Sequence, residues 1–280
     1  MLAIVLLLIF GGVGWVIWAN TAVELSQYSV SCSQLPEAFD GYRIAQLSDL
    51  HATELGESHE TILALLREAE PDMIAITGDL VDSRTTYVQS ALQFVQEALQ
   101  IAPCYYVPGN HEGRLAARGL EYDDLKAALE AAGVVILDDR STQIDLDGAA
   151  ITVLGVNDPR FRVDFWRDDT LEFMDTKLKE LNFSGDDFTL LLSHRPELFD
   201  AYVSNGVDLV LSGHVHGGQI RMPFVGGLVA PDQGVFPKYD AGLFAQDRTQ
   251  MIVSRGLGKS IFPLRVNNRP EIILIELKCT

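Results

Sequence analysis

The sequence contains little cysteine and little positive charge. It has three cysteines, Cys32, Cys104 and Cys279, and 21 Lys and Arg residues against 39 Asp and Glu, which gives a formal net charge of −18. Three scattered cysteines indicate neither a disulfide framework nor the spacing of a zinc finger. The acidic balance, with no cluster of Lys and Arg, would repel the backbone of a nucleic acid. We therefore expect no nucleic-acid partner.

Several motifs that would supply a protein nucleophile or a nucleotide site are also absent. The chain has no G-x-S-x-G, no Walker loop and no reactive-cysteine motif. It also lacks the H-x-H-x-D-H cluster of metallo-β-lactamase-like hydrolases. These absences disfavour serine, cysteine and P-loop chemistry, and they disfavour that class of metal hydrolase.

Charged side chains are missing from residues 1–19, which are dominated by Leu, Ile and Val. This length is close to the ~20 residues that a helix needs to cross a bilayer, and Trp15 and Trp18 suit the headgroup zone. A cleaved signal peptide is the alternative, but the segment has no Lys/Arg n-region. We expect a single membrane anchor over residues 1–19, with the domain that follows on the extracytoplasmic side.

The rest of the chain alternates short apolar runs with amphipathic patterns, which is typical of an α/β fold. We expect residues 20–40 to form a linker and an edge strand, and residues 41–280 to form one domain. Helical spacing of apolar residues occurs within 62–69, 92–99, 125–132 and 171–181. Asp147-Gly148 joins two further strands as a hairpin. The expected strands cover 44–47, 73–77, 104–107, 143–146, 151–156, 189–192, 208–211, 251–254 and 272–277.

Side chains that can bind a metal follow five of these runs. They are Asp49 and His51, Asp79, Asn110, His194, and His214 with His216. Ligands bind at the carboxyl ends of the strands in an open α/β sheet, so we expect these residues to converge in space.

The histidines are concentrated in the same places. Five of the six histidines belong to the motifs at the strand ends, and only His59 lies outside them. A single histidine is most simply a core or surface residue, but random placement would not collect five at strand ends. The pattern indicates a metal centre, and we assign no function to His59.

The motifs D-x-H, G-D-x-x-D, G-N-H-E, a lone S-H and G-H-x-H occur in this order within residues 43–219. Together they resemble the calcineurin-like metallophosphoesterase superfamily. The tail, with Gly217-Gly218-Gln219 and Ser254-Arg255-Gly256-Leu257-Gly258, resembles its bacterial membrane-anchored branch. Some members of that branch hydrolyse UDP-2,3-diacylglucosamine, a lipid A precursor. The resemblance implies a four-layer α/β/β/α sandwich of two mixed sheets.

The resemblance also implies two metal ions and their ligands. The first ion would be held by Asp49, His51, Asp79 and His216, and the second by Asp79, Asn110, His194 and His214. Asp79 would bridge the two ions, since a carboxylate offers two oxygens and a negative charge. Mixed imidazole, carboxylate and amide ligands favour Mn, Fe or Zn over Mg, and we expect Mn.

Two such ions would generate a bridging hydroxide that attacks a phosphoester or a pyrophosphate. The resemblance assigns His111, which is not a ligand, to stabilising the transferring phosphoryl group or protonating the leaving oxygen. We expect Glu112 and Asp82 to orient ligands, with a role for Asp82 at a helix start as the alternative.

Residues 223–244 form a long stretch of Gly, Pro and aromatic residues that we expect at the substrate lip. Its apolar side chains would suit a lipid-linked phosphoester, although they could simply pack the loop onto a sheet. Arg221 and Arg255 are the candidate substrate-binding residues, and Lys238 and Lys259 are further candidate cations. The aromatic residues of this stretch are Phe224, Phe236, Tyr239 and Phe244.

A catalytically silent membrane scaffold that binds metal is the competing hypothesis. Such a protein would be expected to have lost a ligand or His111, and all are present. The motifs do not distinguish monoester, diester and pyrophosphate substrates, and they do not define the oligomeric state.

Overall fold

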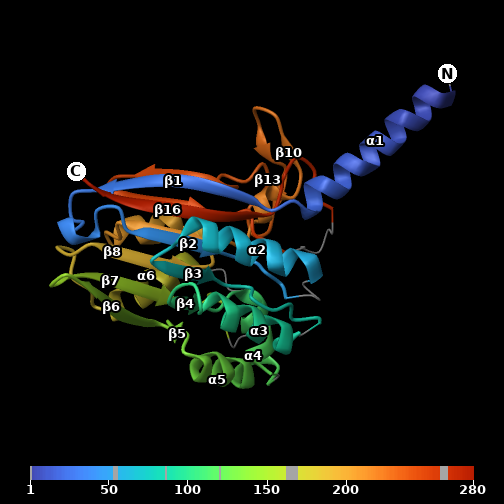
Figure 1. Ribbon diagram of the computed structural model, residues 1–280. Coiled ribbons are helices and arrows are strands. Elements are labelled where there is room, and N and C mark those ends of the chain that lie inside the picture. The colour runs from blue at the N-terminus through green and yellow to red at the C-terminus, as the bar shows by residue number, and fades with distance from the viewer. Residues whose placement is uncertain (1, 53–55, 86, 120, 162–169, 259–263) are drawn as a thin grey trace.

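Two mixed six-stranded sheets lie face to face in the computed structural model (Figure 1). The structure describes residues 2–52, 56–85, 87–119, 121–161, 170–258 and 264–280. This arrangement confirms the predicted α/β class with two mixed sheets.

The first sheet has the strand order β1-β16-β2-β3-β4-β5. All its neighbours are parallel except β16 and β2, which pair antiparallel. Residues near the two ends of the chain therefore meet in one sheet, with β1 at its edge. The strands are β1 (Glu24–Cys32), β2 (Arg43–Leu47), β3 (Met73–Thr77), β4 (Cys104–Val107), β5 (Val135–Ile136) and β16 (Glu271–Cys279).

The second sheet has the order β14-β15-β9-β8-β7-β6. Its three central pairings are parallel, and an antiparallel hairpin closes each edge. The predicted hairpin at Asp147-Gly148 joins β6 to β7. The strands are β6 (Arg140–Leu146), β7 (Ala149–Val156), β8 (Thr189–Ser193), β9 (Leu209–Ser212), β14 (Gly242–Gln246) and β15 (Thr249–Val253).

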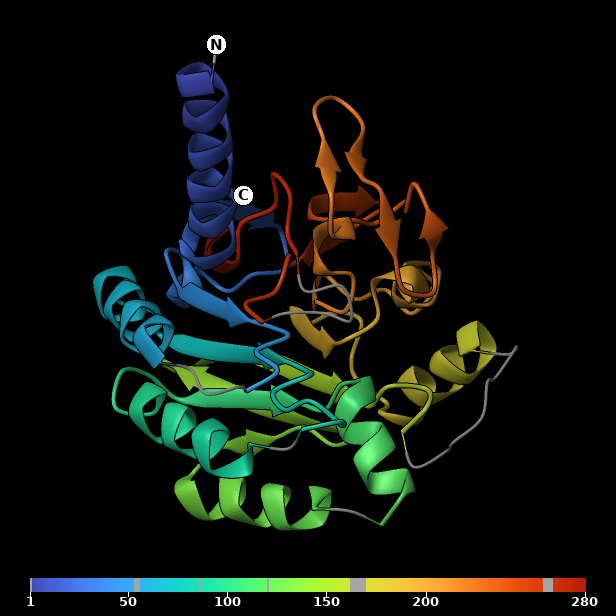
Figure 2. The ribbon, with the colours of Figure 1, turned by 90° about the vertical axis from the view of Figure 1, so that its right-hand side faces the viewer.

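Helices cover the outer face of each sheet (Figures 1 and 2). Helices α2 (Gly56–Ala69), α3 (Val88–Ala98) and α5 (Tyr122–Ala132) bury apolar side chains such as Leu63, Phe94 and Leu125 on the first sheet. Helices α6 (Thr170–Glu180) and α7 (Phe199–Ser204) pack on the second sheet. A further apolar cluster, which includes Ile44, Val153 and Ile275, fills the space between the sheets. The chain is therefore a four-layer sandwich whose layers follow the apolar periodicity of the sequence.

Helix α1 (Leu2–Thr21) extends away from the sandwich (Figures 1 and 2). Among the residues whose side chains are described, no helix combines the length and the apolar character needed to cross a membrane. The side chains of residues 1–9 lie outside the described part, and the predicted membrane span over residues 1–19 stays a prediction.

The stretch 223–244, which we expect at the substrate lip, is partly ordered as β-structure. Two short antiparallel ladders occur here, β10 (Arg221–Met222) with β11 (Gly226–Gly227), and β12 (Val229–Ala230) with β13 (Gly234–Val235). Strands of two residues give too weak an alternation to be seen in a sequence. They project the stretch as a ridge from the domain (Figure 1).

Candidate metal centre

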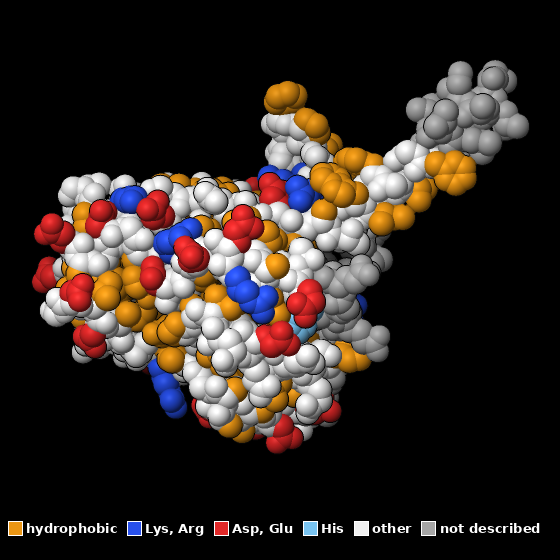
Figure 3. All heavy atoms as spheres, viewed as in Figure 1, with side chains coloured by type: hydrophobic (Ala, Val, Ile, Leu, Met, Phe, Trp, Pro, Cys, Tyr) orange, Lys and Arg blue, Asp and Glu red, His pale blue; other side chains and the backbone are white. Residues whose placement is uncertain are grey.

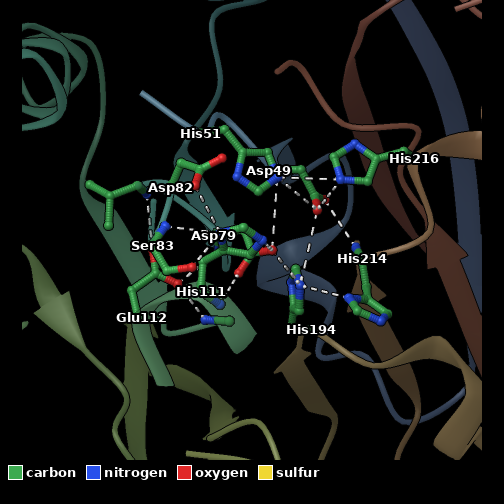
Figure 4. A network of polar contacts seen from close by, with 12 residues as sticks. Asp49, His51, Asp79, Asp82, Ser83, His111, Glu112, His194, His214 and His216 are labelled. Carbon is green, nitrogen blue, oxygen red and sulfur yellow. Dashed lines mark hydrogen bonds and ion pairs between the residues drawn. The ribbon is translucent and has the colours of Figure 1, made fainter. Parts of the chain in front are cut away.

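The predicted ligands converge at the carboxyl ends of β2, β3, β4, β8 and β9 (Figure 4). Backbone hydrogen bonds hold the first two loops together: Asp49 N–H donates to Gly78 O at 3.0 Å, and His51 N–H donates to Asp79 O at 2.9 Å. The side chain of Gln46, fully buried, donates to Ser212 O at 2.8 Å and so ties the first sheet to the second.

One group of ligand atoms consists of Asp49, His51 and His216. Nε2 of His216 lies 3.3 Å from Nε2 of His51 and 3.3 Å from Oδ1 of Asp49. Nε2 of His51 lies 3.8 Å from Oδ2 of Asp79. The structure therefore brings together the four residues predicted to hold the first ion.

A second group consists of Asp79, His194 and His214. Nε2 of His194 lies 3.2 Å from Oδ2 of Asp79 and 3.2 Å from Nδ1 of His214. Oδ2 of Asp79 therefore faces both groups, as a bridging carboxylate would. Asn110, the first residue of α4 (Asn110–Ala117), is buried, and the backbone N–H of the next residue, His111, donates to Oδ1 of Asp79 at 2.8 Å.

The donor atoms fit two bound cations. Oδ1 of Asp49 and Oδ1 of Asn110 are buried and have no hydrogen-bond partner among the described residues. Oδ2 of Asp49, in contrast, accepts from Ser48 Oγ at 2.7 Å and from His214 N–H at 3.0 Å. Buried oxygens without partners are costly, and coordination to a cation would satisfy them.

Backbone strain is concentrated at the same residues. Asp49, His51, Asp79, His214 and His216 have φ values of 50°, 44°, 50°, 71° and 47°. A non-glycine residue with positive φ is uncommon, and such strain collects at functional sites. Five of the seven predicted ligands adopt this conformation.

Gly109 allows the backbone to approach Asp79 closely. A Cβ at this position would lie 2.3 Å from Oδ1 of Asp79 and 2.6 Å from its backbone N. Only glycine leaves room for the shared carboxylate.

The protonation states suit metal binding at most of the imidazoles. Burial lowers the pKa of His51 and of His214, and it lowers the pKa of His216 to about 3, so these rings are neutral near pH 7. Burial also opposes charge on His194, but Asp79 and Asp49 outweigh it and raise its pKa to about 10. Nδ1 of His194 donates to Thr77 O at 2.8 Å, which leaves Nε2 facing Asp79. A cation must displace the proton on that nitrogen.

His111 lies beside both groups, and its ring packs against His51 at a centroid distance of 4.6 Å. The backbone N–H of Ser83 donates to its Nδ1 at 3.0 Å, so a neutral ring carries its proton on Nε2. Nε2 points toward Asp79, 4.0 Å from Oδ2 (Figure 4). Burial opposes charge on His111, but Asp79 and Asp82 outweigh it and raise its pKa.

Asp82 and Glu112 hold the surrounding structure. Asp82 lies 3.6 Å from Nδ1 of His111 and accepts hydrogen bonds from Arg84. Helix α3 starts only at Val88, so Asp82 does not stand at the start of that helix. Glu112 accepts from Asp79 N–H at 3.0 Å, Val81 N–H at 3.0 Å and Gly109 N–H at 2.8 Å. One carboxylate therefore joins the loops that follow β3 and β4.

An ionic network that we did not predict borders the second group. Arg195, fully enclosed, pairs with Asp158, Glu197 and Asp232. Asp158 follows β7, so the rule that located the other strand-end residues could also have identified it. Asp232, on the projecting ridge, had no such signal.

The predicted substrate-binding arginines lie elsewhere. Arg221 and Arg255 line a cavity of about 280 Å³ together with Tyr28, Glu24 and Glu271. Arg255 pairs with Glu271 at 2.6 Å, and Arg221 pairs with Asp240 at 3.0 Å. No described contact joins them to the ligand groups, and their role in substrate binding stays a prediction.

Lys238 and the sixth histidine also have their described contacts outside the two groups. Lys238 is positioned over the ring of Tyr239, and Lys259 lies outside the described residues. His59 contacts Glu97 and Phe94, outside both ligand groups.

The aromatic residues of the stretch 223–244 divide into two pairs. Tyr239 is buried and packs against Phe199 and Phe244 on the second sheet. Phe224 and Phe236 are exposed. Packing onto the sheet therefore accounts for one pair only.

The chain is similar in sequence to known proteins. The chain is 29% identical over 277 residues to the metallophosphoesterase YkuE of Bacillus subtilis, covering 96% of this chain and 91% of that protein. It is 30% identical over 240 residues to the phosphodiesterase YaeI of Escherichia coli, covering 84% and 82% of the two chains.

A solved structure and a family model agree with these relatives. The crystal structure of TT1561 from Thermus thermophilus superposes with a TM-score of 0.50 at 16% identity, over 76% of this chain and 88% of that one, which shows the common fold. The model of the calcineurin-like phosphoesterase family matches residues 42–218, the region that carries every predicted metal ligand. The chain therefore belongs to the calcineurin-like phosphoesterase family.

Proposed function

We propose that this chain hydrolyses phosphoesters at a centre of two transition-metal ions, with Mn as the expected metal. Its membership of the calcineurin-like phosphoesterase family and its similarity to a phosphodiesterase identify the chain as a hydrolase that acts on phosphoester bonds. The observation that carries the proposal is that Oδ2 of Asp79 faces both ligand groups, at 3.8 Å from His51 and 3.2 Å from His194.

The ligand atoms define what the chain contributes to such a centre. Asp49, His51, Asp79 and His216 would hold the first ion, and Asp79, Asn110, His194 and His214 the second. When bound, two such ions activate a water molecule and neutralise the charge of the phosphoryl oxygens. Glu112 and the backbone bonds between the loops hold these side chains in place, so that little reorganisation is needed during reaction.

His111 would supply the proton for the leaving group. The acid form is the imidazolium, whose two protons lie on Nδ1, 3.6 Å from Asp82, and on Nε2, on the side of Asp79. A positioned donor at this atom can protonate the leaving oxygen as the bond to phosphorus breaks. The raised pKa of His111 keeps a proton available near neutral pH.

We further propose a lipid-linked phosphoester or pyrophosphate as substrate, of the kind represented by UDP-2,3-diacylglucosamine in lipid A biosynthesis. The support is the projecting ridge, where Phe224 is fully exposed and Val225, Val235 and Phe236 are more than half exposed. Figure 3 shows hydrophobic side chains gathered at the top of this projection. The same ridge reaches the second ligand group, because Asp232 lies 2.9 Å from Nε2 of His214.

A location at the membrane through residues 1–19, with the domain on the extracytoplasmic side, is also a proposal. It rests on the uncharged sequence of that segment alone. Fractionation of cells that express the full chain and a chain without residues 1–19 tests it. The deleted chain should leave the membrane fraction and keep its turnover of small substrates, because no predicted ligand lies in that segment.

Turnover by the Mn²⁺-loaded protein separates an enzyme from a catalytically silent metal-binding scaffold. Bis(p-nitrophenyl) phosphate, p-nitrophenyl phosphate and UDP-2,3-diacylglucosamine represent the diester, the monoester and the lipid-linked pyrophosphate. His194→Ala should lose most of the turnover, and His59→Ala, which changes a histidine outside the centre, should keep it. A wild-type protein that binds Mn²⁺ and turns over none of the three substrates would favour the scaffold.

A further inference from the structure

The two ring nitrogens of His214 face different surroundings. Nδ1 lies 3.2 Å from Nε2 of His194, inside the second ligand group. Nε2 lies 2.9 Å from Oδ2 of Asp232 and 3.0 Å from Nη1 of Arg195. A neutral imidazole that binds a cation through Nδ1 carries its proton on Nε2. That proton needs an acceptor, and Arg195 offers donors only, so Asp232 is the acceptor of the two.

Asp232 reaches this position from the turn between β12 and β13. The residue lies on the exposed ridge, yet its side chain is only 12% exposed. Its φ is 59°, so the turn adopts a left-handed conformation at this point. Strain of this kind persists where surrounding contacts fix the residue.

Two arginines hold the carboxylate. Arg160 donates to Oδ1 of Asp232 at 2.6 Å, and Nη1 of Arg195 donates to Oδ2. Arg195 is itself held by Asp158 and by Glu197, the latter at 3.1 Å. The position of Asp232 is therefore set by a chain of charge-assisted hydrogen bonds that starts at the end of β7.

We propose that Asp232 is a positioning residue for the second metal ion. It accepts the Nε2–H of His214, fixes the tautomer that leaves Nδ1 for the metal, and connects the ridge to the centre. A carboxylate in this role also raises the basicity of its histidine. The inference rests on the proposed two-metal function.

The test compares Asp232→Asn with Asp247→Asn. Asp247, in the turn between β14 and β15, also has positive φ, at 52°, and is exposed. Asn tolerates the left-handed region, so both variants keep the turn and lose one charge. Equilibrium dialysis with Mn²⁺ should show the second site of Asp232→Asn weakened about 10–100-fold and the first site unchanged. Asp247→Asn should match the wild type.

A spectroscopic measurement separates positioning from general structural damage. In the Zn²⁺-loaded, ¹⁵N-labelled wild type, His214 should show a proton on Nε2 that is protected from exchange with water. In Asp232→Asn this proton should exchange faster, while the signals of His51 and His216 stay in place. Arg160→Gln removes a hydrogen bond to the Asp232 carboxylate but keeps the carboxylate itself. It should give a smaller loss of second-site affinity and a smaller increase in proton exchange. This variant replaces Asp232→Asn in the test if Asp232→Asn fails to fold.

Different results would overturn the two-metal function and the positioning role of Asp232. A wild-type protein that binds fewer than two ions would overturn the two-metal function itself. Two ions in the wild type, with unchanged second-site affinity and unchanged His214 signals in Asp232→Asn, would overturn only the role of Asp232.

Discussion

The backbone amide of His111 donates a hydrogen bond of 2.8 Å to Oδ1 of Asp79, the residue whose other oxygen faces both ligand groups. One carboxylate thus positions the backbone of the candidate proton donor and the two groups of ligand atoms. Substitutions of Asp79 and of His111 should therefore have different effects on metal content.

Replacing Asp79 by Ala should remove both metal ions, because each group loses the oxygen that they share. Elemental analysis of the purified variant measures this. Asp147→Ala, a change at the exposed turn of the β6–β7 hairpin, is the control and should keep both ions. Retention of both ions by Asp79→Ala would contradict the shared carboxylate.

Replacing His111 by Ala should keep both ions and lower kcat by about 10²–10⁴ with an alkoxide leaving group. A smaller loss is expected with nitrophenolate, which needs little protonation. Equal losses would instead indicate stabilisation of the phosphoryl group in the transition state.

His194→Ala or His214→Ala should lose the second ion, and excess Mn²⁺ should partly restore turnover. Metal loss in His111→Ala with both ions kept in His214→Ala would reverse the assigned roles.

Replacing Gly109 by Ala should weaken metal binding by roughly 10–100-fold, comparable to the loss of a group that orients ligands. The added methyl group would lie 2.3 Å from Oδ1 of Asp79 and must displace it. Gly185→Ala, where a Cβ meets nothing within 4 Å, is the matched control. Mn²⁺ titration of both variants measures the difference, and equal affinities would argue against the close approach.

The ion pair of Asp138 with Lys126 predicts a pH-dependent stability. Burial opposes the charge, but hydrogen bonds from Lys126 and Asn157 outweigh it and hold the pKa of Asp138 below its usual range. The folded pKa is therefore lower than the unfolded pKa of about 3.9. The pair stabilises the fold above that pH, and the contribution is lost as the pH falls through the folded pKa.

Asp138→Asn should accordingly lower the free energy of unfolding by roughly 1–2 kcal/mol at pH 7. The difference from the wild type should shrink as the pH falls below the unfolded pKa of about 3.9 and through the lower folded pKa. Urea denaturation of chelator-treated protein at several pH values measures it without a contribution from metal loss. A difference that does not change with pH would contradict the ion pair as its source.

The sequence predicted which side chains converge because the candidate ligands follow strands whose apolar runs are easily recognised. β3 spans the predicted residues 73–77 and β4 the predicted residues 104–107, so the loops that carry Asp79 and Asn110 were located from the strand ends. The loops after them were short enough that strand order alone brought their side chains together.

Residues that act through tertiary contacts were not visible in the same way. Asp232 lies far from any long strand. Its proposed role depends on contacts with Arg160, Arg195 and His214, which are distant in sequence. Arg221 and Arg255 were chosen for their charge, but nearby carboxylates pair with both. A charge in a sequence does not show which partner will neutralise it.

The place of β16 in the first sheet has a consequence for synthesis of the protein. β16 lies between β1 and β2, and its residues 271–279 are made long after the strands on either side. While the nascent chain emerges from the ribosome, β1 has no partner in its sheet and β2 has one open edge. Unpaired edges of this kind favour association with other chains. We therefore expect the emerging chain to depend on chaperones until β16 is added.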